Sequence, residues 1–341
     1  MSTLAGSRSL SSRTMKPLSM IAVITASWVL LASASAYAQS LAVLVGIYFL
    51  LAHSLNIVIG YTDLISFGHA AFFAVGAYGA SLAAVHWHTG LVVGALFGAA
   101  LAALLAILVG LASVRLSGVY FALATLAAAE IVRIILLNWI PLTRGPLGLS
   151  IPLAEKTLIP GLPLTQGVFI HLVFGVAIVV VMGTWVLLRS DLGQRMIAVR
   201  ENAKLAASIG VSPTKYRLIA FAVSGAVAAV AGSLFAFNYG IVTPTLSGLH
   251  YSSIALLMVI FGGRGTLLGP FIGAAVFVLL PDLIDVNGAL GEVLFAVVLL
   301  AVVLLMPQGV IGTVRGFLRD RRQSSVRSGS VAQYAIKESS K

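Results

Sequence analysis

Long apolar runs, separated by short polar turns, fill most of the 341-residue chain. A membrane-spanning helix needs about 20 consecutive apolar residues. The pattern therefore predicts an all-α integral membrane protein with about ten transmembrane segments, although the eighth and ninth runs are short for a full crossing. The predicted segments are residues 18–38, 41–60, 64–85, 91–113, 118–139, 166–188, 217–239, 250–263, 266–281 and 289–307.

Composition supports the membrane assignment. The chain is 60% hydrophobic and 9% charged, whereas a soluble domain has about 25% charged residues. Cysteine is absent, which excludes disulfides, thiolate catalysis and cysteine metal sites. A net charge of +11 is compatible with nucleic-acid binding, but the positions of the basic residues favour a topological role instead.

Lysine and arginine gather in alternate connections between the predicted segments. The outer connections hold only Arg144 and Lys156. Because basic loops stay in the cytoplasm, the bias places both termini inside the cell. Residues 1–17 are then a cytoplasmic segment, residues 18–307 a membrane domain, and residues 308–341 a basic tail predicted to be disordered near anionic lipid.

The first segment has two interpretations. Residues 1–38 combine basic residues with a short apolar run and end in Ala36-Tyr37-Ala38, which also describes a cleavable signal peptide. Cleavage would not change the orientation of the rest, so the charge bias does not decide between them. We favour a retained first helix, since a polytopic protein does not require a cleaved signal.

Two connections are long and hydrophilic. The outer one, residues 140–165, is rich in proline and glycine and is predicted to form a structured cap with short helices at most. The inner one, residues 189–216, is charged and helix-prone. Over residues 195–210 its small residues Ala203, Ala206, Ala207 and Gly210 recur at helical spacing.

Motifs for enzyme chemistry are not found in the sequence. There is no phosphate-binding G-x-x-x-x-G-K-[ST], no H-E-x-x-H and no G-x-S-x-G. His86 and His88 are predicted to be a solvated pair rather than a metal site, because no acidic residue is near them in sequence. The chain is therefore predicted not to be an enzyme and to hold no cofactor or metal.

The stretch GYTDLISFGHAAFFAVGAYGA (residues 60–80) breaks the apolar pattern with glycine, aspartate and histidine. Asp63 is expected at a cytoplasmic turn. Gly68, Gly76 and Gly79 are expected to allow close helix packing. His69 follows the break directly, and two roles remain open: a buried histidine bonded to a backbone carbonyl, or a residue of a transport path.

Four blocks, in order, resemble the branched-chain amino acid ABC importer permeases of the LivM type. GYTDLISFGHAAFFAVGAYGA resembles that family's GYxGxxSxGHxAFxxxGAY, and FGGRGTLLGPFIGA resembles its GGxGxxxGPxxGA. GVYFALATLAAAEIVRIILLNW with LTRGPLGL, and SDLGQRMIAVRENAKLAASIGVSPTKYRLIAF, are similar to the blocks between them. The resemblance runs from about residue 45 to residue 310. Asp63 and Arg264 depart from it, both at predicted turns.

The resemblance implies an importer in the bacterial inner membrane. Such permeases pair with a second, homologous permease, two cytoplasmic ATPase subunits that bind ATP, and a periplasmic substrate-binding protein. It also implies that the 189–216 loop carries the coupling helix. The candidate ATPase contacts are Arg200, Glu201, Ala206, Ala207 and Gly210.

The remaining candidate residues concern the transport path and helix packing. Glu130 and Arg133 share a helix face and are predicted to pair inside the bundle, with direct substrate contact as the alternative. A mildly polar path for an apolar zwitterion has candidates in Ser66, His69, Thr125 and Asn138. The further candidates for helix packing are Gly262, Gly263 and Gly269.

Other functions remain open. An ion-coupled secondary transporter usually needs an intramembrane carboxylate, and Glu130 is the candidate, but Arg133 would hold it ionised. An intramembrane protease would need paired aspartates or a serine–histidine pair, of which only serine with His69 is conceivable. Within the family, urea or a short amide are alternative substrates.

Overall fold

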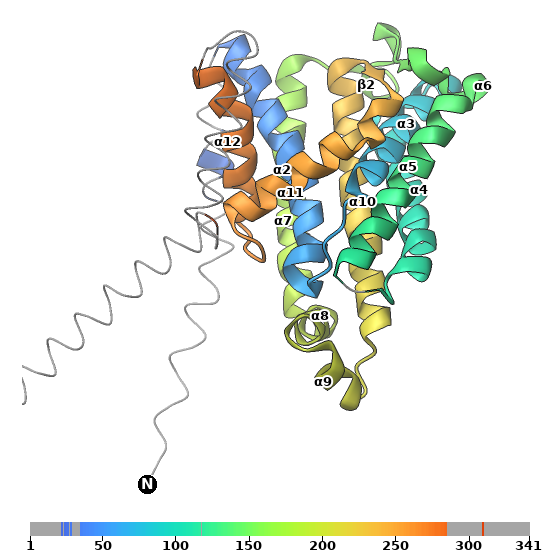
Figure 1. Cartoon of the computed structure of the whole chain (residues 1–341). Helices are drawn as coiled ribbons and strands as arrows, with labels where there is room; N and C mark the ends of the chain where they lie inside the picture. The colour runs from blue at the N-terminus through green and yellow to red at the C-terminus, as the bar shows by residue number, and fades with distance from the viewer. Residues whose placement is uncertain are drawn as a thin grey trace, which may run out of the picture.

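The structure is a computed structural model that describes residues 22, 24–26, 28, 35–116, 118–284 and 309. Within these ranges six helices are long and apolar enough to span a membrane, and they form one bundle (Figure 1). They are α2 (Ala36–Thr62), α3 (His69–Trp87), α4 (Leu91–Ser113), α5 (Val119–Asn138), α7 (Gln166–Arg189) and α10 (Pro213–Tyr239).

Eight of the predicted segments correspond to helices, including the shorter α11 (Leu249–Gly262) and α12 (Gly269–Ile284). Of the other two, residues 289–307 lie outside the described residues, and residues 18–38 lie mostly outside them. The count of ten therefore stays a prediction. Helix α3 starts five residues later than the pattern indicated, because Asp63 ends α2 in a left-handed conformation with φ of 55° and no helix resumes before His69.

Small residues bring the central helices into close contact. A Cβ on Gly76 of α3 would lie 2.2 Å from the Ala229 carbonyl oxygen of α10. On the side of α4, a Cβ on Gly79 would lie 2.9 Å from the Gly98 Cα. Backbones at these distances leave no room for larger side chains. Helix α3 therefore packs closely against α10 on one side and against α4 on the other.

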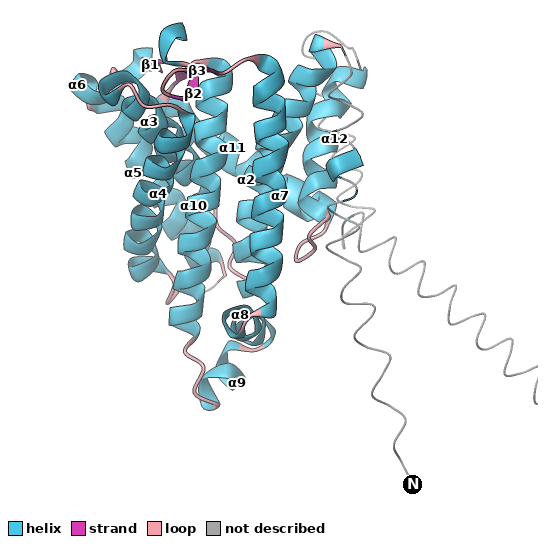
Figure 2. Ribbon diagram, turned by 180° about the vertical axis from the view of Figure 1, so that it is seen from behind, coloured by secondary structure: helices cyan, strands magenta, loops and turns pink. Residues whose placement is uncertain are grey.

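The turn between α11 and α12 is equally tight. A Cβ on Gly262 would lie 1.8 Å from the Gly269 carbonyl oxygen, so the two helix ends touch through bare backbone. Gly263 has φ of 111°, a conformation that residues with a side chain rarely adopt. The glycines of this turn let the ends of α11 and α12 pack closely, while the residues between Gly262 and Gly269 form a loop that extends from the helices (Figure 2).

One end of the bundle carries a folded cap (Figure 2). Short strands occur here as well as the expected short helices, and β1 pairs antiparallel with β4, Leu149 opposite Val242. The expectation of short helices at most was therefore wrong, because the extended backbone finds a partner far along the chain. The cap elements are α6 (Ile140–Thr143), η1 (Gly145–Leu147), β1 (Leu149–Ser150), η2 (Leu153–Glu155), β2 (Thr157–Ile159), β3 (Leu162–Pro163), β4 (Ile241–Val242) and η3 (Pro244–Ser247).

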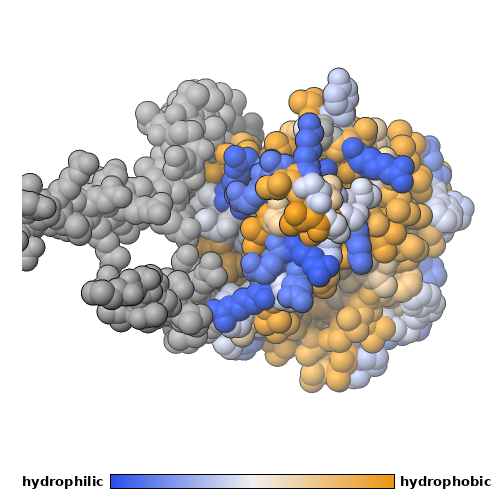
Figure 3. Space-filling model, turned by 90° about the horizontal axis from the view of Figure 1, so that it is seen from below, coloured by the Kyte–Doolittle hydropathy of each residue, from blue (hydrophilic) through white to orange (hydrophobic). Residues whose placement is uncertain are grey.

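The opposite end carries two helices outside the bundle, α8 (Asp191–Glu201) and α9 (Ala203–Ser208). Viewed from this end, hydrophilic residues gather in the middle and apolar residues flank them (Figure 3). We call it the basic end. The positive-inside rule indicates that it faces the cytoplasm. Its exposed basic residues are Arg115, Arg189, Arg195, Lys204, Lys215 and Arg264.

Candidate transport and coupling sites

The α8–α9 unit at the basic end occupies the position of the predicted coupling helix. The prediction of one helix over residues 195–210 was wrong, because Asn202 adopts an extended conformation with φ of −158° and ends α8. Its side-chain oxygen then accepts hydrogen bonds from the backbone amides of Lys204 and Leu205, at 3.1 and 3.0 Å, and caps α9. Asparagine is among the residues most favoured at this capping position.

The unit shares a small apolar core with the start of α10, and this core separates the predicted docking residues into buried and exposed ones. Ala206 is 3% exposed and packs in this core, so it faces inward. Glu201, Ala207 and Gly210 are exposed. The core residues are Met196, Val199, Ala206, Tyr216 and Ala220.

Arg200, a predicted ATPase contact, instead points toward the bundle. Its Nη1 donates a hydrogen bond of 2.7 Å to the Gly60 carbonyl oxygen, near the end of α2. Gly265, in the turn between α11 and α12, lies so close that a Cβ there would be 2.8 Å from Arg200 Nη1. Arg200 thus connects α8 to the end of α2 and to the turn between α11 and α12.

Asn56 completes this arrangement from inside α2. Its side-chain oxygen accepts a 2.8 Å hydrogen bond from the Gly265 amide, and its Nδ2 donates a 2.9 Å bond to the Thr266 carbonyl oxygen. We call Arg200, Gly60, Asn56, Gly265 and Thr266 the basic-end junction. It fastens α8, α2 and the α11–α12 turn together.

A second contact holds α8 against α10. Arg195 Nη1 donates a 2.6 Å hydrogen bond to the Tyr216 hydroxyl. This hydrogen bond raises the pKa of the Arg195 guanidinium above its ordinary value, so the side chain stays charged. Movement of α8 is therefore linked to three bundle segments: α2 and the α11–α12 turn through the junction, and α10 through Tyr216.

Two of the predicted path residues, Ser66 and His69, belong to a buried polar network. His69 Nε2 is bonded to the Ser224 hydroxyl of α10, and that hydroxyl donates a 2.8 Å hydrogen bond to the Ser54 carbonyl oxygen of α2. Ser66 Oγ lies 3.4 Å from His69 Nδ1. The histidine is fully buried, and its partner is a serine side chain rather than the backbone carbonyl of the first alternative. The network joins three helices, and its polar groups are hydrogen-bonded to one another rather than turned toward a solute.

The other two predicted path residues differ from each other. Thr125 is fully buried and its hydroxyl accepts a 3.1 Å hydrogen bond from the Phe67 amide. Gly68 packs on the same residue, with a Cβ position 2.5 Å from the Thr125 carbonyl oxygen. Asn138 is exposed at the end of α5 and donates to the Ile134 carbonyl oxygen at 2.8 Å. Only Asn138 faces outward.

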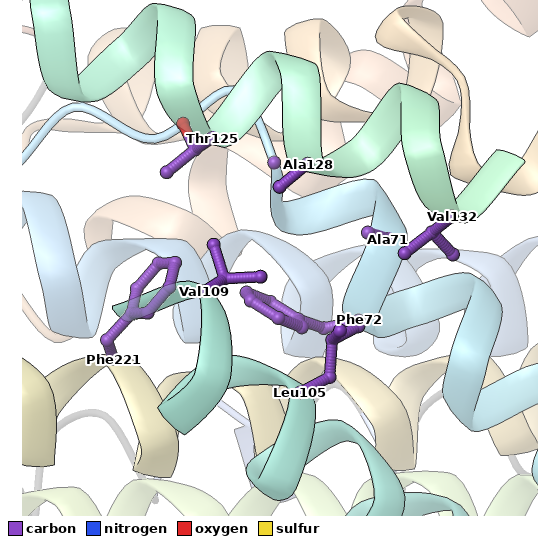
Figure 4. Close-up of a pocket in the computed structure, with 9 residues that line it drawn as sticks. Ala71, Phe72, Leu105, Val109, Thr125, Ala128, Val132 and Phe221 are labelled. Carbon is purple, nitrogen blue, oxygen red and sulfur yellow. The ribbon is translucent and has the colours of Figure 1, made fainter. Parts of the chain in front are cut away.

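Neither of two hollows that lie between the described helices suits a charged solute. The first lies between α3, α4, α5 and α10 and is too narrow for a water molecule; Thr125 is the polar side chain in its lining (Figure 4). The second is an open groove of ≈ 210 Å³ between α4, α7 and α10, lined only by apolar residues. A path for a zwitterion therefore does not run through either hollow.

Glu130 and Arg133 of α5 bond to each other, but not inside the bundle as expected. Arg133 Nε lies 2.9 and 2.8 Å from the two Glu130 carboxylate oxygens, and Nη2 lies 2.5 Å from Oε1. The Glu130 side chain is 48% exposed and that of Arg133 is 33% exposed. The pair lies on the outer face of α5 because buried Ala129 and Val132 occupy the inner face.

The cap end brings one more polar contact into view. His88 Nδ1 lies 2.8 Å from Glu155 Oε1, so the loop histidine does have an acidic neighbour, from a residue distant in sequence. Nearby, burial lowers the pKa of the Lys156 ammonium. No group of three or more potential metal ligands occurs in the described part of the chain.

Several residues that organise these sites were not singled out from the sequence. Asn56, Ser224 and Ser252 are buried polar residues in apolar helices, and Ser252 Oγ accepts a 3.0 Å hydrogen bond from the Ala70 amide. A polar side chain in the middle of a long apolar run is itself a signal, because it needs a partner there. What the sequence does not give is which partner.

Comparisons with known proteins agree with this architecture of an all-α, multi-pass membrane protein. A profile of the family described as branched-chain amino acid transport system / permease component matches residues 37–306. The chain therefore belongs to that family, and it is a multi-pass protein of the bacterial inner membrane.

Individual relatives cover most of the chain. It is 30% identical to the high-affinity branched-chain amino acid transport system permease protein LivM of Salmonella typhimurium, over 87% of this chain and 75% of that protein. It is 31% identical to LivM of Escherichia coli, over 82% and 71%. The autoinducer 2 import system permease protein LsrC of an Enterobacter species is 35% identical, but over 44% of each chain. No solved structure matches.

Proposed function

We propose that the chain is one permease subunit of an ATP-driven importer for branched-chain amino acids. The LivM relatives support this substrate class because they match along most of the chain, whereas the autoinducer 2 permease matches less than half of it. Urea or a short amide remain the alternatives within the family. The partners are a second, homologous permease, two cytoplasmic ATPase subunits and a periplasmic substrate-binding protein.

The observation that carries the proposal is the α8–α9 unit at the basic end. A coupling element must present a surface to the ATPases and be fastened to the helices that move. Leu205 of α9 and Ile209 directly after it are 62% and 71% exposed, and aliphatic side chains grouped in this way suit a partner surface. The junction through Arg200 supplies the connection to the bundle.

ATP is bound by the partner subunits in this proposal, since the chain has no phosphate-binding loop. The chain itself needs no cofactor. Closure of the ATPases moves α8, and the basic-end junction transmits that movement to α2 and to the α11–α12 turn. An ion-coupled secondary carrier would need no such unit.

The experiment is uptake of radiolabelled leucine by liposomes that contain the chain together with the transport proteins encoded beside it. We expect uptake that requires both ATP and the binding protein, with no ATP hydrolysis by the purified chain alone. Uptake by the chain alone, driven by an ion gradient, would overturn the proposal in favour of a secondary carrier.

A matched pair of variants tests the coupling step. A hydrogen bond to a charged group is worth about 1.5–3 kcal/mol, so Arg200→Met is expected to lower leucine uptake per ATP hydrolysed roughly tenfold or more. Arg115→Met, exposed at the same end, serves as the control. An unchanged ratio in Arg200→Met would contradict a coupling role for the junction.

Orientation can be tested on the same cysteine-free chain. Cysteines introduced at Lys204 and Lys156, which lie at opposite ends of the bundle, are expected to react with an impermeant maleimide from opposite sides of the membrane. Reaction of both from the outside would contradict a cytoplasmic basic end.

A further inference from the structure

The outer face of α5 carries charge at an unusual depth. Glu130 follows the start of α5 by 11 residues, or about 16 Å at 1.5 Å per residue in a helix about 30 Å long. Among the described membrane-length helices, Glu130 is the Asp, Glu, Lys or Arg residue that lies farthest from a helix end, and Arg133 follows it by three residues. Glu130 therefore lies near the middle of the helix.

Lipid is a poor neighbour for this face. A charged residue at the centre of a membrane helix costs about 2.5–3.5 kcal/mol for Asp, Lys or Arg, and such residues normally face protein or a water-filled cavity. Yet both side chains are substantially exposed in the isolated chain. In the assembled transporter this face must therefore border either water or another subunit.

The residues around the pair favour the first of these, a water-filled path that carries an aliphatic amino acid. Ile131 and Ile134 are exposed beside the pair, and the small residue Ala127 is exposed one turn before Glu130. A carboxylate and a guanidinium flanked by branched aliphatic side chains complement a zwitterion with an aliphatic side chain. Neither of the two hollows described above is lined by a charged group.

We propose that Glu130 and Arg133 form a substrate subsite in the wall of the transport path, which runs along the outer face of α5. The proposal rests on the proposed function as an amino acid importer. Arg133 pairs with the substrate α-carboxylate, and Glu130 accepts hydrogen bonds from its α-ammonium. When no substrate is present, the two side chains form an ion pair with each other across one helical turn, so neither charge is unpaired in the empty path.

A planar guanidinium is suited to the first of these contacts, because it binds a carboxylate through two parallel hydrogen bonds. The substrate exchanges one ion pair for two, so neither protein charge is left unpaired while it passes. The aliphatic side chains beside the pair contact the apolar side chain of the substrate without enclosing it in a deep pocket. A low-affinity subsite of this kind permits release, which a path requires.

An exchange of the two charges separates a substrate contact from a structural pair. Glu130→Gln and Arg133→Met are each expected to reduce leucine uptake at least tenfold. The double variant Glu130→Arg/Arg133→Glu keeps an ion pair at the same spacing, so its abundance and assembly are expected to match the parent. Its leucine uptake is expected to stay at least tenfold below the parent, because the charges now oppose those of the substrate. Parental uptake in the double variant would overturn the inference and make the pair structural.

Cysteine labelling of the assembled complex gives an answer that does not depend on transport. Ala127→Cys and Ile134→Cys flank the pair, and Leu108→Cys on the exposed face of α4 is the lipid-facing control. We expect a charged, water-soluble thiol reagent to label the first two, with protection by millimolar leucine, and to leave the control unlabelled. Absence of labelling at both α5 positions would overturn the inference.

The two proposals can fail separately. If the parent complex shows no ATP-dependent leucine uptake, the proposed function fails and the amino acid subsite fails with it. If the parent complex transports leucine and the charge-exchanged variant transports it equally well, only the subsite on α5 is wrong.

Discussion

Helices α3 and α4 are consecutive, pack against each other, and differ in an instructive way. Among the six described spans α3 has the lowest mean hydropathy, 1.3, yet 72% of it is buried. Helix α4 has the highest, 2.7, and only 22% of it is buried. In a soluble protein the more apolar helix would be the more buried one.

The reason is that lipid is as apolar as a protein core. Burial in a membrane bundle is gained by small residues that allow close approach and by polar residues that bond across helices. Helix α3 has both, in Gly76, Gly79 and His69. Helix α4 buries a stripe of small residues that includes Gly94, Gly98 and Ala102, and most of its leucines are exposed. Hydropathy therefore finds a span, but glycine and polar positions indicate which way it faces.

The largest effect of the difference between buried α3 and exposed α4 is expected at Gly76. Gly76→Leu puts a side chain where a Cβ alone would lie 2.2 Å from the Ala229 carbonyl oxygen. We expect the folded permease to disappear from the membrane, because backbone atoms cannot yield as a side chain can. Gly183→Leu on α7, where the added atom meets nothing within 4 Å, is the control. Immunoblots of membranes measure both, and parental abundance of Gly76→Leu would show that the contact is dispensable.

The same distinction between buried and exposed small residues applies to the α8–α9 unit. Ala206→Arg is expected to unfold the unit, since Ala206 is 3% exposed among apolar neighbours. Ala207→Arg on the exposed side is expected to leave the permease stable but to block the ATPase, so that leucine uptake and stimulated ATP hydrolysis are lost together. Co-purification of the ATPase with each variant is the measurement. Parental transport by Ala207→Arg would show that this surface is a solvated connector.

A smaller effect is expected at Asn56, a buried polar residue in an apolar helix. Asn56→Ala removes two hydrogen bonds to the α11–α12 turn. At about 1 kcal/mol each, their loss is expected to cost about 2 kcal/mol and to lower the Tm of the purified complex by several degrees. Ser40→Ala, on the exposed side of the same helix, is the control. Equal Tm values for the two variants would contradict the role given to the junction.

The smallest effect is expected on the lipid-facing side of α4. Leu108 is 58% exposed, so Leu108→Ala removes little packing and is expected to change stability by less than about 0.5 kcal/mol. The thermal stability of the purified complex measures the change. A loss as large as that of Asn56→Ala would mean that another subunit covers this face.

The sequence predicted the helices better than it predicted the sites. Apolar runs located α4 at residues 91–113 and α7 within one residue, because long spans leave a strong signal. The start of α3 was placed five residues too early and the division of the coupling loop at Asn202 was missed, since both depend on local backbone conformation that hydropathy does not detect. Arg200 was expected to face a partner and instead contacts Gly60, a choice that only tertiary packing decides.

The same division of properties between α3 and α4 bears on how the chain enters the membrane during synthesis. A segment with glycines, a histidine and low hydropathy is a weak signal for the insertion machinery, while a leucine-rich segment is a strong one. Only the short connection His88 to Gly90 separates the two helices, and Gly79 and Gly98 let them touch. The pair is thus suited to enter the bilayer as one hairpin. The high hydropathy of α4 favours insertion of both helices and compensates for the low hydropathy of α3, whose glycines and histidine pack the bundle.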